Sequence, residues 1–168
     1  MERVLVIGSP GAGKTTLSRR LAEKWGLPLI HLDKLYWRDN WQPAPYEEFE
    51  ARLLEAAARP AWILDGNYSR TLPLRLERCD TVIYLDYPRA VCLWGVLRRV
   101  AAGYGRTRPD MGVGCPERLD WDFLKYVWRF PKNQRRKLFS LLDGQEGKTV
   151  VVLRSRRETA RWLEGLAT

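Results

Sequence analysis

The chain has 168 residues, of which 45% are hydrophobic, and it carries a net charge of +9. A chain of this length can bury one sizeable core, so we expect a single domain over residues 1–168. The three cysteines, Cys79, Cys92 and Cys115, are an odd number without C-x-x-C spacing, which argues against a disulfide framework and against a zinc site. No apolar stretch reaches about 18 residues and no signal peptide is visible, so we expect a cytoplasmic protein without a membrane span.

The first predicted strand, Val4 to Ile7, leads into a glycine-rich turn and then into a helix. Residues 8–15 fit the spacing G-x-x-x-x-G-K-[ST], and apolar residues recur at helical spacing from Lys14 to Trp25. Strand, glycine loop and helix in this order are typical of a P-loop (Walker A), whose backbone N–H groups and helix dipole bind phosphate. The residues expected to surround a nucleoside triphosphate are Gly8, Ser9, Pro10, Gly11, Ala12, Gly13, Lys14, Thr15 and Thr16.

Two side chains of this loop have predicted roles of their own. Lys14 would reach the β- and γ-phosphate oxygens, and the Thr15 hydroxyl would bind a Mg²⁺ ion that bridges those oxygens. The alternative is a glycine-rich turn with a chance Lys-Thr pair. No G-x-G-x-x-G motif occurs in the chain, which argues against a dinucleotide-dependent oxidoreductase.

The second predicted strand, Leu29 to Leu32, ends beside an acid and an aromatic stretch. Asp33 could orient a substrate hydroxyl or accept its proton, or it could be a helix cap or loop hydrogen-bond acceptor. Trp37 and Trp41 could stack on a flat substrate group, although core packing is an equally simple role for a tryptophan. The single histidine, His31, is assigned no chemistry.

Three further strands are predicted at Trp62 to Leu64, Val82 to Leu85 and Thr149 to Leu153. Asp65 follows the first of these and matches the Walker B position, which would order the water shell of Mg²⁺. Asp86 has the same placement, but Tyr87-Pro88 follows at once and favours a helix-start residue there.

Helical patterns separate the strands, which predicts an α/β fold with a parallel sheet, crossover helices and ligands at the carboxyl ends of the strands. Beyond Lys14 to Trp25, the predicted helices are Tyr46 to Ala58, Arg89 to Ala101, Asp120 to Phe130, Asn133 to Leu142 and Arg157 to Leu166.

Positive charge is concentrated in the second half, since residues 85–168 hold 17 of the 29 basic side chains. These arginines could neutralise a triphosphate or contact a nucleic acid backbone. For the run at 135–137, a solvated helix face is the simpler interpretation.

Three quoted segments carry a family resemblance. "GSPGAGKTT", "LDGNYSRTL" and "VIYLDYPRAVCLWGVLRRV" resemble the adenylate-kinase-like nucleotide and small-molecule kinases. Within that group, "HLDKLYW", "DGNY", "GCPERLDWDFLKYVWRFP" and "VVVLRSRRE" are similar to the DNA topology modulation (FlaR-related) proteins. The resemblance implies a three-layer sandwich whose five-stranded parallel sheet has the P-loop strand in the middle, with a substrate-binding insert at 34–60 and an arginine-bearing lid at 102–119.

The resemblance also implies site residues. Asp65 would lie near Mg²⁺, and Arg98 or Arg99 would close over the transferring phosphoryl group together with Arg106 and Arg108. The adenine ring would lie beside Arg154 and Arg156. The composition of the lid agrees, because glycines, prolines and arginines alternate as a closing loop needs; a loose surface loop with solvated arginines is the alternative.

The sequence departs from the adenylate kinase pattern on the acceptor side. Asp65-Gly-Asn-Tyr-Ser-Arg70 replaces Asp-Gly-x-Pro-Arg, and the Thr-Gly-Asp segment that grips a nucleoside monophosphate is absent. The place of Asp33 is closer to that of the acid in shikimate and gluconate kinases, which weakens the case for AMP as acceptor.

Together these observations predict a monomeric, ATP-binding, Mg²⁺-dependent phosphotransferase whose acceptor is an unidentified nucleotide or small molecule. Lys14, Asp33 and the arginines at 98, 106 and 108 would be catalytic. The alternatives are a nucleotide-dependent, DNA-associated regulator that binds nucleic acid without sequence specificity, and a plain NTPase.

Overall fold

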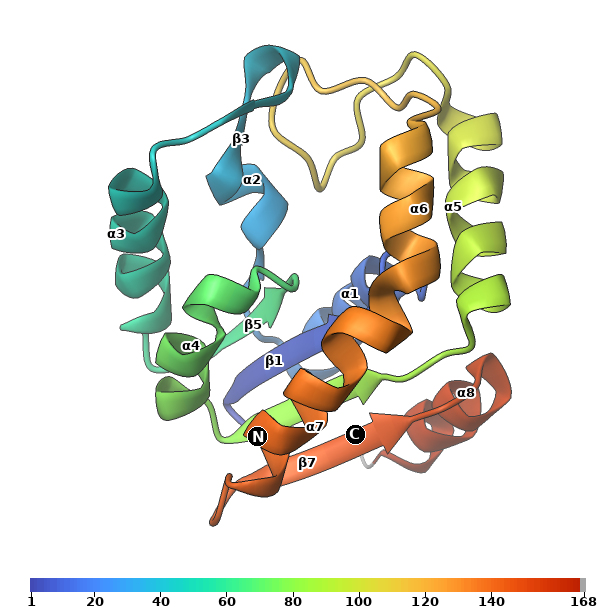
Figure 1. Ribbon diagram of the computed structural model, residues 1–168. Helices are drawn as coiled ribbons and strands as arrows, with labels where there is room; N and C mark the ends of the chain where they lie inside the picture. Colours follow the sequence, from blue (N-terminus) through green and yellow to red (C-terminus); the bar gives the residue numbers. More distant parts are fainter. Residues whose placement is uncertain (167–168) are drawn as a thin grey trace.

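The computed structural model describes residues 1–166, so residues 167 and 168 of the predicted domain lie outside the described residues. Five parallel strands form the central sheet in the order β2-β5-β1-β6-β7 (Figure 1). Their bounds are β1 Arg3–Gly8, β2 Leu29–His31, β5 Trp62–Asp65, β6 Thr81–Leu85 and β7 Thr149–Leu153. The predicted parallel sheet, with the P-loop strand at its centre, is confirmed.

Alternate residues of β1 face opposite sides of the sheet, and each side has its own core. Leu5 and Ile7 pack with residues of α2, α3, α4 and α7 and with the last residue of α6, whereas Val4 and Val6 pack with residues of α1, α5, α6 and α8. The chain is therefore an α/β three-layer sandwich of the P-loop NTPase type, like that of adenylate kinase.

The helices run in chain order between the strands. Their bounds are α1 Lys14–Trp25, α2 Leu32–Tyr36, α3 Tyr46–Ala57, α4 Leu72–Arg78, α5 Arg89–Gly103, α6 Trp121–Phe130, α7 Arg136–Asp143 and α8 Arg156–Gly165. A π-helical turn, η3 Pro131–Arg135, joins α6 to α7. None of the helices in residues 1–166 is long and apolar enough to span a membrane.

The segment 34–60, which the resemblance leads us to expect as an insert, contains a small antiparallel hairpin. β3 Trp37–Arg38 pairs with β4 Gln42–Pro43 across the 3₁₀ turn η1 Asp39–Trp41. Asn40 and Trp41 both have φ near +60° in this turn, a backbone conformation that side chains other than glycine adopt at a cost. The segment 102–119, whose first two residues belong to α5, lies directly beside this hairpin in Figure 1, although the two are far apart in sequence.

Several predicted elements were wrong in detail. Leu32 begins α2 instead of ending the second strand, and α4, preceded by the 3₁₀ turn η2 Ser69–Thr71, was not predicted at all. The break expected before Asn133 is absent, because the π turn carries the helix on without interruption through the described residues of this stretch. Asp86 does not start a helix: α5 is preceded by Pro88, and the Asp86 carboxylate pairs with Arg135 Nε at 2.8 Å.

Candidate functional site

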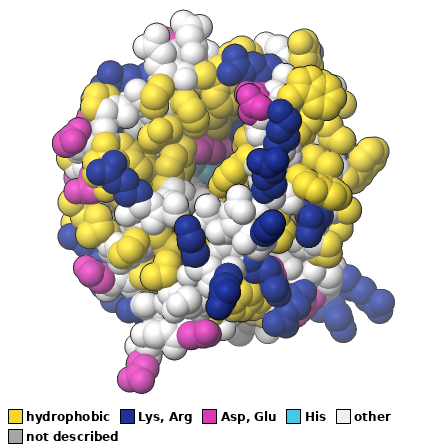
Figure 2. All heavy atoms as spheres, viewed as in Figure 1, with side chains coloured by type: hydrophobic (Ala, Val, Ile, Leu, Met, Phe, Trp, Pro, Cys, Tyr) yellow, Lys and Arg dark blue, Asp and Glu magenta, His cyan; other side chains and the backbone are white. Residues whose placement is uncertain are grey.

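The carboxyl ends of the strands open into a cavity of about 1320 Å³. Its walls come from the P-loop, the loop after β5, the hairpin of the insert, the segment 102–119 and helices α5, α6 and α8. Figure 2 shows this hollow with an acidic side chain and the single histidine at its bottom and basic side chains along one rim. This is the position that open parallel sheets offer to ligands.

The P-loop is shaped by glycines with positive φ. Gly8, Gly11 and Gly13 have φ of +148°, +79° and +98°. Gly13 caps α1 without any side-chain hydrogen bond to the helix, so the first amides of α1 remain available to a ligand. A side chain at Gly11 would be blocked, because a Cβ there would lie 2.0 Å from the carbonyl oxygen of Cys92 on α5. The fold therefore fixes a concave row of backbone donors suited to phosphate.

Lys14 lies folded back on this loop. Its Nζ donates to the carbonyl oxygens of Gly8 at 3.0 Å and Ser9 at 3.1 Å. Burial lowers the pKa of Lys14, and the charges of Asp65 and Asp33 oppose that shift. A phosphate oxygen placed in the loop would give the ammonium group a stronger partner than these carbonyls.

Oxygen donors for a metal ion converge at the start of α1. Thr15 Oγ1 donates to Asp65 Oδ2 at 2.8 Å, and His31 Nδ1 lies 3.0 Å from the same carboxylate oxygen. A hydroxyl and a carboxylate are hard ligands of the kind Mg²⁺ prefers. The contact with His31 holds the Asp65 carboxylate in its orientation. Residues 1–166 hold no group of three or more His, Cys, Asp or Glu side chains arranged for a metal, but a Mg²⁺ ion bridging phosphates needs only one or two protein ligands. The residues therefore fit Mg²⁺ bound together with a nucleotide.

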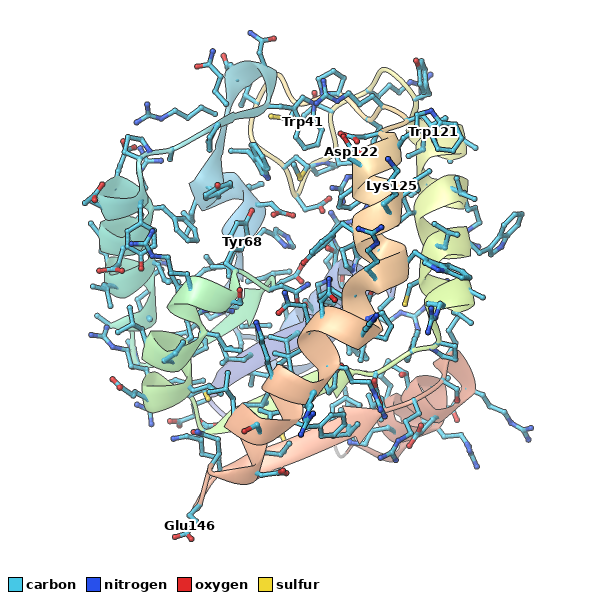
Figure 3. All side chains as sticks on the ribbon, viewed as in Figure 1. Trp41, Tyr68, Trp121, Asp122, Lys125 and Glu146 are labelled. Atoms are coloured by element: carbon cyan, nitrogen blue, oxygen red, sulfur yellow. The ribbon has the colours of Figure 1, made fainter. Side chains whose placement is uncertain are left out.

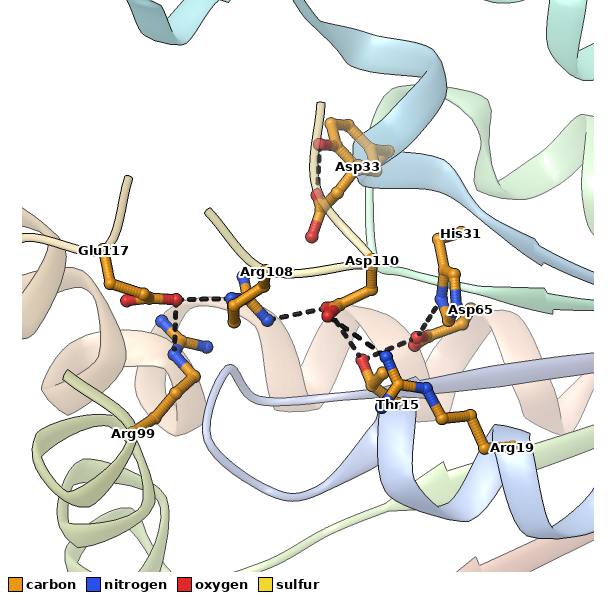
Figure 4. Close-up of polar contacts among 10 residues, drawn as sticks. Thr15, Arg19, His31, Asp33, Asp65, Arg99, Arg108, Asp110 and Glu117 are labelled. Carbon is orange, nitrogen blue, oxygen red and sulfur yellow. Dashed lines mark hydrogen bonds and ion pairs between the residues drawn. The ribbon is translucent and has the colours of Figure 1, made fainter. Parts of the chain in front are cut away.

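Side chains of the segment 102–119 form a series of ion pairs that reaches Thr15 (Figure 4). Asp110 accepts from Thr15 Oγ1 at 3.4 Å, from Arg108 at 2.7 Å and from Arg19 at 3.5 Å. Buried Glu117 pairs with Arg108 and, at 3.1 Å, with Arg99. Burial, together with the neighbouring Arg108, lowers the pKa of Arg99. Arg99 and Arg108 are thus held above the P-loop by carboxylates that phosphate oxygens could replace.

Asp33 lies on the opposite wall. Tyr68 donates its hydroxyl proton to Asp33 Oδ1 at 2.5 Å, and the other carboxylate oxygen points toward the segment that carries Arg108 and Asp110 (Figure 4). Burial raises the pKa of Asp33, while the Tyr68 hydrogen bond and the charge of Lys14 lower it in part. A carboxylate with a raised pKa and one free oxygen is suited to accept a proton.

The loop after β5 is fixed by two polar side chains. The Asn67 amide bonds Gly8 in both directions, with Oδ1 3.0 Å from the amide nitrogen and Nδ2 2.6 Å from the carbonyl oxygen. Fully buried Arg75 donates to the carbonyl oxygens of Gly66, Asn67 and Tyr68. Tyr68, and through it Asp33, is thereby positioned relative to the P-loop.

The segment 102–119 is closed onto the insert. Trp41 Nε1 donates to the carbonyl oxygen of Pro116 at 3.1 Å, and the Asn40 amide donates to Gly114 at 3.0 Å. A Cβ at Gly112 would lie 2.1 Å from the carbonyl oxygen of Trp37, so only glycine fits there. Figure 3 shows Trp41 beneath this segment and Tyr68 in the interior of the molecule. The segment 102–119 therefore covers the part of the cavity that Trp37 and Trp41 line.

The predicted site residues fall into two groups. Lys14, Thr15, Asp33 and Asp65 come together around the cavity, which Pro10 to Thr16 also line. The predicted arginines at 98, 108 and 156 line the cavity as well. Arg106 and Arg154 are exposed and do not line it. The roles of all these residues stay predictions.

Sequence reasoning missed several residues of the site. Asp110 and Glu117 were not singled out, and neither were Asn67, Tyr68 and Arg75. The glycine and proline content of 102–119 signalled a loop that could close, but no local pattern indicated which of its acids would reach Thr15. For Asn67 and Tyr68, their place directly after the strand that ends at Asp65 was a usable signal.

Comparisons with known proteins point the same way. A sequence model of the ATPase family associated with various cellular activities (AAA) matches residues 4–65, from β1 to the end of β5. The adenylate kinase of Mycobacteroides abscessus is 30% identical over 115 residues, which cover 56% of this chain and 61% of that protein. The adenylate kinases of Mycobacterium leprae and Mycobacterium marinum are 36% and 38% identical over 93 residues, which cover 53% of this chain and 49% of each relative. The chain thus spans about half to three fifths of the length of the curated relatives it matches.

Fold and P-loop geometry define a class: the chain has the α/β fold of a P-loop protein, with a five-stranded parallel sheet and the phosphate-binding loop after its central strand. Over about half of its length it is similar to adenylate kinases.

Proposed function

We propose that the protein is an ATP-dependent, Mg²⁺-requiring phosphotransferase. The observation that carries this proposal is the convergence of three groups on one cavity: the P-loop with Lys14, the Thr15–Asp65 pair, and Asp33 on the facing wall. A plain NTPase would need the first two groups, but it has no use for a half-buried acid on the wall that faces them.

Stabilisation of charge on the transferring phosphoryl group is assigned to residues on both sides of it. The P-loop amides and Lys14 act from one side, and Arg99 of α5 and Arg108 of the segment 102–119 act from the other. Donors and cations fixed before the reaction cost no reorganisation during it, and losing one typically slows such reactions by about 10²- to 10³-fold. We therefore assign Arg99, rather than the exposed Arg98, to the transferring group.

The Thr15 hydroxyl and the Asp65 carboxylate would hold Mg²⁺, with His31 keeping the carboxylate in place. When bound, the ion neutralises charge on the phosphate oxygens and orients them. The adenine ring would lie beside Arg156, Thr159 and Ala160, which line the end of the cavity next to α8. Arg154 lies outside that lining.

On the acceptor side, Asp33 would accept the proton of an attacking hydroxyl. Its free carboxylate oxygen points toward the segment that carries Arg108 and Asp110, and Tyr68 holds its other oxygen (Figure 4). The segment 102–119 would exclude water, so that the phosphoryl group reaches the acceptor instead of being hydrolysed.

The experiment is an ADP-release assay with Mg²⁺-ATP, run with and without nucleoside monophosphates and hydroxylated metabolites. We expect at least one acceptor to accelerate ADP release, and we expect Lys14→Ala to remove most of that activity while its thermal unfolding midpoint stays near the wild-type value. Hydrolysis to inorganic phosphate that no acceptor accelerates would establish a plain NTPase instead.

A DNA-associated role is the second candidate, in keeping with the narrower resemblance to DNA topology modulation proteins. It is favoured by the exposed arginines after β7, at positions 154, 156, 157 and 161. These offer phosphate-backbone contacts but no base-reading motif, so such binding would be non-specific.

A further inference from the structure

The acceptor end of the cavity differs in chemistry from the nucleotide end. It is lined by aromatic and apolar side chains around one carboxylate, with the hydroxyl of Tyr68 bonded to that carboxylate. The lining residues here are Asp33, Trp37, Trp41, Tyr68, Ser69, Leu72 and Met111. Trp37 and Trp41 meet edge to face, with ring centroids 5.4 Å apart.

The cations that line the cavity lie away from the two tryptophans or are already paired with a carboxylate. Lys14 lies on the P-loop, Arg99 and Arg108 pair with Glu117, and Arg19 pairs with Asp110. Arg20, Arg98 and Arg156 belong to α1, α5 and α8. Among the described lining residues, Arg118 is the cation nearest the tryptophans: it lies over the Trp41 ring at 5.6 Å and 4.0 Å from Asp120.

The arginine that follows the strand ending at Asp65 is also turned away from the cavity. Arg70 follows the Asp65-Gly66 turn, but it is exposed, and its guanidinium group lies 3.4 Å from the centroid of the Tyr46 ring. It is absent from the described lining of the cavity, and so is every Lys and Arg of the insert 34–60. A phosphorylated acceptor would therefore bring its dianion toward Asp33, and the two cations whose charges act on Asp33, Lys14 and Arg108, are already bound to P-loop carbonyl oxygens and to Asp110 and Glu117.

From this placement we propose, resting on the phosphotransferase function above, that the acceptor is an unphosphorylated alcohol with a flat or apolar ring, such as a nucleoside. Its ring packs against Trp37 and Trp41, and its hydroxyl donates a hydrogen bond to Asp33. In the transfer step the hydroxyl oxygen forms a bond to the γ-phosphorus, the bond from that phosphorus to the bridging oxygen breaks, ADP leaves, and the hydroxyl proton passes to the Asp33 carboxylate.

The size of the pocket agrees with this acceptor. The cavity of about 1320 Å³ exceeds the roughly 300 to 1,000 Å³ of an ordinary ligand site, as a site for two ring-bearing molecules should. Stacking on an aromatic side chain contributes affinity for a ring without requiring charge.

The test uses matched pairs of acceptors with the full chain and Mg²⁺-ATP. Each pair is an alcohol and its own phosphate: nucleosides with their 5′-monophosphates, and sugars and cyclic polyols with their phosphates. We expect at least one unphosphorylated member to raise ADP release about tenfold or more, while its phosphorylated counterpart does not. The phosphorylated product should be detectable by ³¹P NMR.

Each other outcome overturns the inference in a recognisable way. Acceleration by a phosphorylated acceptor, whether or not its alcohol is also active, would refute the acceptor class but leave the phosphotransferase function standing. Steady hydrolysis that no member of either class accelerates would refute both.

A pair of tryptophan variants tests the packing. Trp37→Ala should raise the KM for the active alcohol by about tenfold, as loss of one stacking contact predicts, and leave the KM for ATP unchanged. Trp94→Ala is the control, because Trp94 is 64% exposed on α5 and lies outside the cavity lining. Equal effects of the two variants on the KM of the alcohol would contradict the assignment.

Discussion

Gly11 and Gly13 of the P-loop allow a prediction that separates an effect on folding stability from an effect on ligand binding. Both have positive φ, so alanine at either position costs about 1 to 2 kcal/mol of backbone strain. At Gly11 the new Cβ would also lie 2.0 Å from the Cys92 carbonyl oxygen, whereas at Gly13 no atom lies within 4 Å. Overpacking against backbone adds about 1 to 3 kcal/mol, and it applies to Gly11→Ala alone.

These values translate into melting temperatures. At about 2 to 4 °C per kcal/mol for a chain of this length, Gly11→Ala should melt about 4 to 20 °C below wild type and Gly13→Ala about 2 to 8 °C below. Gly13 lines the cavity in front of the α1 amides, so a methyl group there occupies space that we assign to phosphate.

The assay is thermal unfolding with and without Mg²⁺-ATP. For a wild-type chain with ATP at about 100 times its Kd, ligand binding adds about 2.7 kcal/mol to stability. We expect Gly13→Ala to lose most of this ligand-dependent rise while remaining the more stable of the two variants without ligand. A Gly13→Ala protein that keeps the full rise, or equal melting temperatures for the two variants without ligand, would refute the reasoning.

Further predictions concern Thr15, the activity and pH dependence of Asp33, and DNA binding. Thr15→Val should raise the Mg²⁺ concentration needed for half-maximal transfer, and Thr15→Ser, which keeps the hydroxyl, should not; equal effects would contradict a metal-binding hydroxyl. Asp33→Asn should lower transfer by about 10²- to 10⁴-fold and leave ATP affinity unchanged. Because Asp33 acts ionised and burial raises its pKa, the wild-type rate should fall on acidification at a pH above the ordinary aspartate pKa of about 3.9, and the Asn variant should lack this acid limb; a retained limb would assign it to another group. Duplex DNA should bind at low salt and lose most affinity at physiological salt; binding that survives would support the DNA-associated role.

The parts of the fold that the sequence predicts are those with local signals. The apolar runs of the strands and the glycine motif all act over a few residues, and the helix at Lys14–Trp25 has the predicted bounds. The short α4 escaped prediction because Leu72–Arg78 makes barely two turns and begins with a proline at its second position.

The missing part of the site depends on contacts between distant segments. Asp110 reaches Thr15, 95 positions earlier, only because Gly112 and Gly114 let the segment 102–119 pack on the hairpin of the insert. Arg75 shows the same limit: a charged residue in a short helix gives no local sign that it will be buried under three carbonyl oxygens. Such positions follow from tertiary packing and not from sequence pattern.

The central claim is that backbone amides between β1 and α1 hold a polyphosphate with Mg²⁺ beside Thr15 and Asp65. Isothermal titration of the full chain with ATP, GTP and their non-hydrolysable analogues, with and without Mg²⁺, tests it most directly. We predict one site per chain, tighter binding when Mg²⁺ is present, and loss of most of the affinity in Lys14→Ala. The absence of binding heat with every one of these nucleotides in the presence of Mg²⁺ would contradict the claim.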